Sequence, residues 1–114
     1  MKILFGLVLL GSLAAAQQMP GSFGNADIKN PQVIAAAKYA LETKNTAMKR
    51  SGSRAYTLLE IEKAQIQVVA GLNYRVCIKV KLGSVQRVAE AMVYQNLQQQ
   101  YSLSSWTWGK CSIK

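Results

Sequence analysis

Residues 67–81 read QVVAGLNYRVCIKVK, and this stretch indicates how the chain folds. From Tyr74 to Val80 every second residue is apolar, and the residues between them are arginine, cysteine and lysine. This period of two is typical of a β-strand that buries one face and exposes the other. Gly71 interrupts the pattern, so we predict that Gln67–Gly71 is the turn between this strand and an antiparallel strand before it.

Three more stretches are rich in β-branched or aromatic residues and predict strands. They are Tyr56–Lys63, Ala91–Asn96 and Tyr101–Cys111. Leu59 and Ile61 should share one face of the first, and Gly83–Glu90 should be a connection. Because the connections are short, we expect all neighbouring strands to be antiparallel.

One helix is expected ahead of the strands. Asn30 suits the N-cap and Pro31 the first helical position. Apolar residues then follow at the spacing of one helical face: Val33, Ala36, Ala37, Ala40 and Leu41. Residues 17–29 should be extended and mobile, and Thr43–Ser53 should lead out of the helix. Since a one-faced sheet needs a cover, we predict an α+β fold, an antiparallel β-sheet wrapped around one α-helix.

Residues 1–16 have the pattern of a secretory signal peptide. Lys2 supplies the positive start, Ile3–Leu13 is an apolar run, and Ala14–Ala16 provides small residues before a cleavage site. The alternative is a membrane anchor, but the run is shorter than the roughly 20 residues that span a bilayer. We therefore predict a secreted, extracellular protein with one domain at residues 17–114.

The composition argues against an enzyme. The formal net charge is +9 and there is no histidine, which removes every Cys-His and Ser-His nucleophile pair. Two cysteines are too few for a metal cage. A basic chain favours anionic partners, but the charges are scattered along the sequence, so we expect neither nucleic acid nor, after signal removal, a membrane as partner. No cofactor and no metal are predicted.

The predicted turn at Gln67–Gly71 is unusually apolar. Turn residues are normally polar, whereas Val68 and Val69 bring two branched apolar side chains to a hairpin tip. Two interpretations are open. The valines belong to the buried face of the strand, or they form an apolar wedge for a partner.

The motifs of this chain resemble those of the cystatin family. QVVAG matches the Q-x-V-x-G signature of cystatins, and Gly71–Tyr74 is similar to the G-x-N-Y that follows it. Ala36–Ala40 followed by Asn45 is similar to the family's helix, and Pro20–Gly21 matches its N-terminal glycine. The resemblance covers nearly all of residues 17–114. It implies a cystatin-like fold and a reversible, competitive inhibitor of papain-like cysteine proteases of the cathepsin class, and we expect a monomer.

The resemblance also implies which residues bind the protease. Cystatins insert an N-terminal segment and two hairpin turns into the active-site cleft. By this likeness Met19 and Pro20 would lie in the non-primed pockets, and Gly21 would let the chain bend away from the catalytic cysteine. The implied protease-binding residues are Met19, Pro20, Gly21, Gln67, Val68, Val69, Ala70, Gly71, Leu97 and Gln98.

The second hairpin departs from the pattern of many cystatins, which carry Pro-Trp there. By position Leu97 and Gln98 should form its tip, as in the stefin branch of the family. Trp106 and Trp108 come later, and their i, i+2 spacing predicts that they cover one face of the sheet.

The cysteines depart from the pattern as well. Cys77 belongs to the outward-facing set of its strand, and Cys111 is expected near the end of the last strand. The family's sheet order would put another strand between them, a separation of about 9–10 Å. A disulfide needs Cα atoms roughly 4.4–6.8 Å apart. Although secretion favours pairing, we therefore do not predict an intramolecular bridge.

A second hypothesis keeps the fold and changes the function. The chain would then be a non-inhibitory cystatin-fold protein that binds anionic surfaces or acts as a basic antimicrobial, because of its net positive charge.

Overall fold

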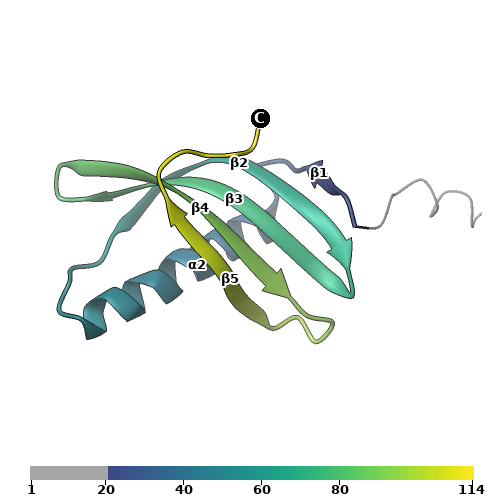
Figure 1. The fold of residues 1–114 in the computed structure, drawn as a ribbon, viewed down its shortest axis with the longest axis horizontal. Helices are drawn as coiled ribbons and strands as arrows, with labels where there is room; N and C mark the ends of the chain where they lie inside the picture. Colours follow the sequence, from purple (N-terminus) through teal and green to yellow (C-terminus); the bar gives the residue numbers. More distant parts are fainter. Residues whose placement is uncertain (1–20) are drawn as a thin grey trace, which may run out of the picture.

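The computed structural model describes residues 21–114, so the predicted signal sequence, Met19 and Pro20 lie outside the described part. Its elements are β1 (Phe23–Asn25), α2 (Pro31–Arg50), β2 (Thr57–Val69), β3 (Gly71–Leu82), β4 (Val85–Gln95) and β5 (Tyr101–Trp108). The strands form one antiparallel sheet in the order β1-β2-β3-β4-β5, and α2 crosses one face of it (Figure 1). The predicted α+β fold is confirmed. Within this part of the chain no helix has both the length and the apolar character to cross a membrane.

The helix starts as predicted but runs further than predicted. The Asn30 side chain accepts a hydrogen bond from the Gln32 backbone N–H at 2.8 Å, which caps the first turn. The expected exit from Thr43 onward was wrong, because α2 continues to Arg50. The Thr43 hydroxyl donates to the carbonyl of residue 39, one turn back, so this polar residue is accommodated inside the helix.

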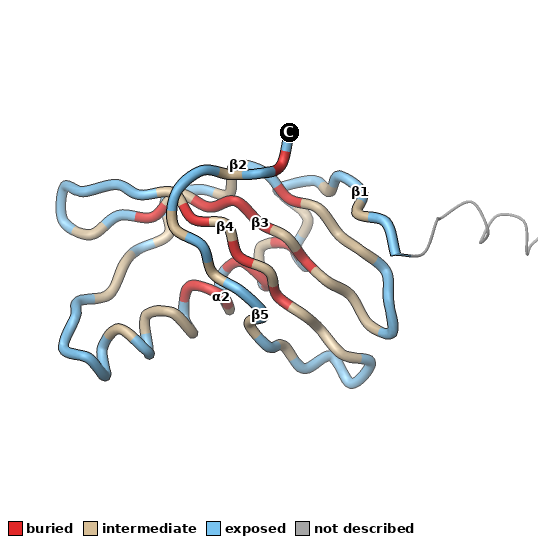
Figure 2. Tube along the Cα trace, in the orientation of Figure 1, coloured by how far each residue is buried: buried red, intermediate tan, exposed pale blue. Residues whose placement is uncertain are grey.

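The core lies between α2 and the inner faces of β3 and β4 (Figure 2). Its buried side chains come from Val33, Ala36, Ala37, Ala40 and Leu41 on the helix, and from Ala64, Tyr74, Val76, Ile78, Val80, Ala89, Ala91 and Val93 on the sheet. The register places Trp106 opposite Ala91 and Trp108 opposite Ala89, so each large ring stands beside a small residue. Both tryptophans pack against the core, as predicted for residues that cover the sheet.

Several strand boundaries differ from the predictions. Residues 83–90 are not a connection, because β4 begins at Val85 and pairs with β3 along its whole length. β5 ends at Trp108 rather than at residue 111. Leu59 is 41% exposed and does not share the buried face with Ile61, because two irregularities in the β2–β3 register fall beside these residues.

The largest correction concerns the cysteines. Cys77 and Cys111 form a disulfide with their Cα atoms 5.7 Å apart. The expected separation assumed that Cys111 lies on the last strand. Instead the chain leaves the sheet at Gly109, whose N–H donates to the Val88 carbonyl, and returns over the outer face of β4 toward β3. Cys77 is fully buried although it belongs to the outer face, because this C-terminal segment covers it.

The C-terminal segment is held by polar contacts as well as by the disulfide. The Glu90 carboxylate accepts hydrogen bonds from the backbone N–H and the hydroxyl of Ser112, both at 2.7 Å. The Lys63 ammonium donates to the carbonyl of Ile113 at 3.3 Å. The segment therefore packs as part of the domain, on the face of the sheet opposite α2.

Candidate functional site

Two hairpin turns and the start of β1 lie at the same end of the molecule (Figure 1). The first turn joins β2 to β3, and the second joins β4 to β5. A groove of about 390 Å³ lies between them. Its lining residues are Gln32, Val68, Val69, Gly71, Leu72, Gln95, Asn96, Leu97 and Gln99. We call this end of the molecule, with both turns and Gly21, the hairpin edge. None of the residues that line its groove carries a charge.

The first turn projects its valines away from the core. Val69 pairs with Gly71, so Ala70 alone forms the tip of the hairpin. The side chains of Val68 and Val69 are 47% and 39% exposed. Of the two interpretations of this apolar turn, the structure excludes burial in the core. Apolar surface at a hairpin tip is unfavourable in water, and burying it against a partner is favourable. Exposed apolar patches of this kind typically mark a surface that contacts another molecule.

Gly71 brings the two turns into contact. Its φ is +111°, and a Cβ at this position would collide with the carbonyl oxygen of Gln95 in β4. Beside it the Tyr94 hydroxyl donates a hydrogen bond to the Ala70 carbonyl. The end of β4 thus supports the tip of the first hairpin directly, and a residue larger than glycine would separate them.

The second turn is built around one asparagine. The Asn96 side-chain oxygen accepts hydrogen bonds from the backbone N–H groups of Gln98 and Gln100, both at 2.9 Å. These contacts satisfy backbone donors that the turn would otherwise leave unpaired. Leu97 is consequently held outward and is 72% exposed, with Gln98 beside it. The prediction that these two residues form the tip of the hairpin is confirmed.

The N-terminal segment is fastened to the first hairpin. The backbone N–H of Gly21 donates to the Val68 carbonyl at 3.3 Å, and the Gln67 amide donates to the Gly21 carbonyl at 2.6 Å. The Asn73 amide in turn donates to the Gln67 side-chain oxygen at 2.7 Å. Gln67 therefore links the facing strand β3 to the segment that precedes β1, and it orients Gly21 along the hairpin edge.

The structure thus brings together the predicted residues Gly21, Gln67, Val68, Val69, Ala70, Gly71, Leu97 and Gln98. Two supporting residues, Asn73 and Tyr94, were not among the predicted site residues. The hairpin register offered a signal for Asn73, because it lies directly opposite Gln67 across a tight turn. Nothing local in the sequence pointed to Tyr94, whose contact depends on strand pairing.

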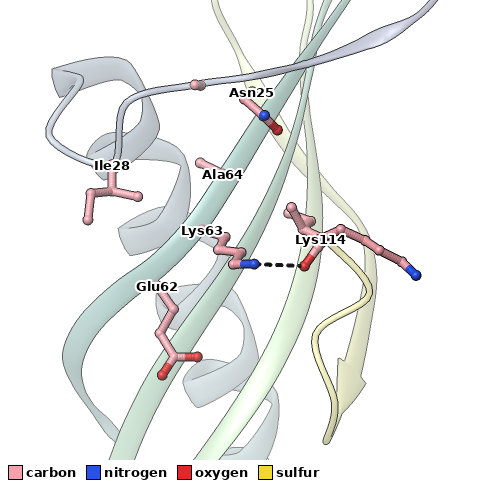
Figure 3. A pocket seen from close by; sticks show the side chains of 8 residues that line it. Asn25, Ile28, Glu62, Lys63, Ala64 and Lys114 are labelled. Carbon is pink, nitrogen blue, oxygen red and sulfur yellow. Dashed lines mark hydrogen bonds between the residues drawn. The ribbon is translucent and has the colours of Figure 1, made fainter.

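A second cavity, of about 240 Å³, lies away from the hairpin edge, between β2, the segment after β1 and the C-terminus (Figure 3). Lys63 and Glu62 line it together with Asn25, Ile28 and Lys114. The Lys63 ammonium is already engaged by the Ile113 carbonyl. This hydrogen bond helps to hold the C-terminal segment, and the cavity shares no lining residue with the groove.

The described residues contain one cluster of metal-ligand types, Cys77, Glu90 and Cys111. The two sulfur atoms are joined to each other, and the carboxylate accepts hydrogen bonds from Ser112. The donor set therefore lacks the free thiolates that a metal would require.

Comparison with known proteins identifies the family. A family model described as "Aspartic acid proteinase inhibitor" matches residues 25–108. Salivary cystatin-L of Ixodes scapularis is 30% identical over 125 positions, which cover 90% of this chain and 93% of that protein. The chain belongs to the cystatin family. This membership places it among protease inhibitors rather than enzymes, in line with the composition.

Other relatives agree with this assignment. L-cystatin of Tachypleus tridentatus is 37% identical over 79 residues, which is 68% of this chain, and the match spans 56% of that relative's length. The crystal structure of mialostatin, a gut cystatin from the hard tick Ixodes ricinus, superposes with a TM-score of 0.65 at 20% identity, covering 80% of this chain and 100% of that chain. A salivary cystatin from the soft tick Ornithodoros moubata gives a TM-score of 0.56 at 22% identity, covering 81% and 100%. These two structures establish the likeness of fold.

Proposed function

We propose that this cystatin is a secreted, reversible, competitive inhibitor of papain-like cysteine proteases of the cathepsin class, and that the hairpin edge is its binding surface. The observation that carries the proposal is the position of Val68 and Val69. Both are exposed at a hairpin tip, and the same edge holds Gly21 and the exposed Leu97. The two hairpins line one uncharged groove, and Gly21 is hydrogen-bonded to the first of them. An uncharged edge of this kind suits a cleft that binds extended peptides.

The mechanism is exclusion of substrate by a wedge. The two valines have about half of their surface in water, so burying the remainder in a cleft contributes about 1 kcal/mol for each. The hydrogen bonds of Asn73, Gln67 and Tyr94 hold the edge in shape before binding, which reduces the ordering cost of association. No covalent bond is formed or broken in this mechanism.

The N-terminal segment extends the same surface. Gly21 has a φ of +93° and its N–H donates to the Val68 carbonyl, so the described part of the chain begins at the hairpin edge. Met19 and Pro20 would then enter the non-primed pockets of the protease, with Gly21 as the bend. Gln98 beside Leu97 would complete the contact on the second hairpin.

Secretion is the second part of the proposal. Residues 1–16 would be removed as a signal peptide and residues 17–114 would act as a monomeric domain. The names of the relatives, which are salivary and gut cystatins of ticks, support an extracellular setting. N-terminal sequencing of the protein from the culture medium of a eukaryotic host should begin at Gln17.

The test of inhibition is titration of the purified protein against papain with a small fluorogenic substrate. Val68→Asp with Val69→Asp should raise Ki by at least roughly a hundredfold, because a charge buried without a partner is strongly penalised. Val85→Asp is the matched control. Val85 is 58% exposed at the β3–β4 hairpin, away from the hairpin edge, so this change should leave Ki unaltered. Undiminished hydrolysis with the unmodified protein in large excess would exclude the proposal.

An aspartic proteinase is the second candidate target, because the family description matched by residues 25–108 names that class. A parallel titration against pepsin distinguishes the two targets. Inhibition of pepsin that survives Val68→Asp and Val69→Asp would assign the aspartic proteinase to a different surface and papain-like enzymes to the hairpin edge. Inhibition of pepsin alone would replace the first proposal.

A further inference from the structure

Basic residues gather at the end of the molecule away from the hairpin edge. Two segments, 43–59 and 79–89, together contain no aspartate or glutamate. Their basic residues are Lys44, Lys49, Arg50 and Arg54 in the first, and Lys79, Lys81 and Arg87 in the second. We call this group of seven residues, four plus three, the basic end. Seven of the 14 lysines and arginines, which look scattered along the sequence, are therefore brought to one end of the fold.

Hydrogen bonds and strand pairing hold the two segments together. The Asn45 side chain exchanges two hydrogen bonds of 2.9 Å with the backbone of Tyr56, which ties the last turns of α2 to the loop after it. The Arg87 guanidinium donates to the Tyr56 hydroxyl at 3.2 Å, and Thr57 pairs with Lys81. The C-terminal end of α2 and the β3–β4 hairpin consequently lie at one end of the molecule, and both turns of the hairpin edge lie at the other (Figure 1).

Most of these cations have no acidic neighbour. Among residues 21–114, Lys79 is the only member of the basic end in an ion pair, with Glu62 at 3.6 Å. Six positive charges remain uncompensated, and they repel one another unless a ligand or salt screens them. Such an arrangement costs free energy in the unliganded protein and favours a polyanion with several charges in a row.

One cation is also held in a fixed position. The Arg87 guanidinium stacks over the Trp108 ring, 3.7 Å from its centroid, and Tyr56 packs against the same ring with centroids 5.2 Å apart. Arginine carries five N–H donors in a planar fork, and one contact to Tyr56 leaves others free for an anion. Because its side chain is already ordered by the ring, Arg87 loses little entropy on binding.

We propose that the basic end binds a sulfated polysaccharide. Such a chain presents tetrahedral anionic groups at regular intervals, which can engage the lysines and arginines that helix, loop and hairpin bring to this end of the molecule. The predicted secretion would place the protein where such chains occur. This inference does not depend on the proposed protease inhibition. Its consequence is that the protein is retained on a polysaccharide matrix while the opposite hairpin edge stays free.

Two other polyanions fit the basic end less well. Anionic membranes are bound by surfaces that also insert a contiguous apolar face. Within the two segments of the basic end, the large exposed apolar side chains are Leu59 and Val85, which lie on different strands. Single-stranded nucleic acids stack their bases on open aromatic rings. The face of Trp108 is taken by Arg87, and its neighbour Trp106 packs edge-on against it at 5.2 Å.

The test is the affinity of the protein for size-defined heparin oligosaccharides, measured at several salt concentrations. The basic-end variant Arg50→Gln, Arg54→Gln, Lys81→Gln is compared with the control variant Lys29→Gln, Lys38→Gln, Lys114→Gln. All six side chains are exposed, and the two variants have the same net charge. We expect the basic-end variant to bind heparin at least roughly tenfold more weakly than the control variant, with a smaller dependence on salt.

The outcomes separate a site from a general effect of net charge. Equal weakening in the two variants would overturn the proposal, as would tighter binding to phosphatidylserine vesicles or to single-stranded DNA than to heparin. Thermal unfolding of both variants verifies that they are folded, and the single variant Arg54→Gln should change the affinity in the same direction. Binding of heparin by the complex with papain is expected, because the two ends lie apart. Mutual exclusion of heparin and papain would place both ligands on one surface and refute the assignment.

Discussion

The Gln67 side chain donates a hydrogen bond of 2.6 Å to the carbonyl of Gly21, a residue 46 positions earlier in the chain. The same side chain accepts a hydrogen bond of 2.7 Å from Asn73 on the neighbouring strand. The first residue of the QVVAG motif therefore acts from the side of the hairpin. It holds the N-terminal segment against the turn, while the valines of the motif carry the apolar surface.

This contact leads to the first prediction. Gln67→Leu removes both hydrogen bonds and leaves the Gly21 carbonyl and the Asn73 amide without their partner. We expect Ki for papain to rise roughly tenfold, equivalent to about 1.4 kcal/mol. Gln86→Leu, an exposed outer-face glutamine paired with Lys81 at the far end of the sheet, should leave Ki unchanged.

Truncation distinguishes positioning from a general loss of structure. If Gln67 acts through the N-terminal segment, Gln67→Leu should have a much smaller effect on Ki in a chain that starts at Gly21. If Gln67→Leu raised Ki by the same factor in the complete and the truncated chains, the positioning role would be contradicted. Such a double-mutant comparison isolates the coupling between the two parts.

The second prediction compares two glycines with similar backbone angles. Gly71 and Gly52 have φ values of +111° and +89°, so alanine is strained at both positions. A Cβ at Gly52 has open space, whereas at Gly71 it would collide with the Gln95 carbonyl. Gly52→Ala should cost about 1 kcal/mol of unfolding free energy and leave Ki unchanged. Gly71→Ala should cost roughly 2–4 kcal/mol and raise Ki at least tenfold, because the two turns are pushed apart. Urea denaturation measures the unfolding free energy of each variant. An equal loss of unfolding free energy in Gly52→Ala and Gly71→Ala would show that the contact with β4 is unimportant.

Local patterns predicted most of the sheet because one face of each main strand is buried. The alternation from Tyr74 to Val80 fixes β3, and β3 pairs with both β2 and β4. β1 was not predicted, since a three-residue strand containing glycine has no pattern of its own and forms only against the edge of β2. The prediction for Leu59 was wrong although its strand does have a pattern. A bulge changes the face on which a residue lies, and it leaves no mark in the amino-acid composition.

The site was predictable where a motif lies within one turn, and unpredictable where its parts meet through the sheet. Val68 and Val69 are adjacent in sequence and remain adjacent in the fold. Tyr94 reaches the Ala70 carbonyl only because β4 pairs with β3 in one register. The disulfide follows the same rule, since the path of the chain after Gly109 depends on where β5 ends.

The third prediction concerns this disulfide. Cys77 and Cys111 are 34 residues apart in the sequence, and closing a loop of that length stabilises the fold by roughly 3–4 kcal/mol in the chain-entropy model. The double variant Cys77→Ala, Cys111→Ala should lose about this much unfolding free energy. Ki for papain, measured well below the melting temperature, should change by less than about twofold, because the bridge lies outside the hairpin edge. Reduction of the unmodified protein should reproduce the same loss of stability. A strong loss of inhibition in the folded variant would instead connect the C-terminal segment to the binding surface.

The last prediction is a pH dependence of stability. Burial of Tyr74, with a smaller contribution from the neighbouring Tyr101, raises the pKa of its phenol above the ordinary value of 10.0. The folded state therefore holds this proton more tightly than the unfolded state, so its contribution to stability is complete below pH 10.0 and is lost as the pH rises toward the folded pKa.

Tyr74→Phe cannot titrate, but it loses the hydrogen bond of 2.9 Å to the Gln95 side chain and should be about 1 kcal/mol less stable at neutral pH. All other titratable groups are the same in the two proteins, so the difference between their unfolding free energies isolates Tyr74. This difference should stay constant up to about pH 9 and shrink above about pH 10, and a constant difference up to about pH 11 would contradict the inference that burial shifts the phenol.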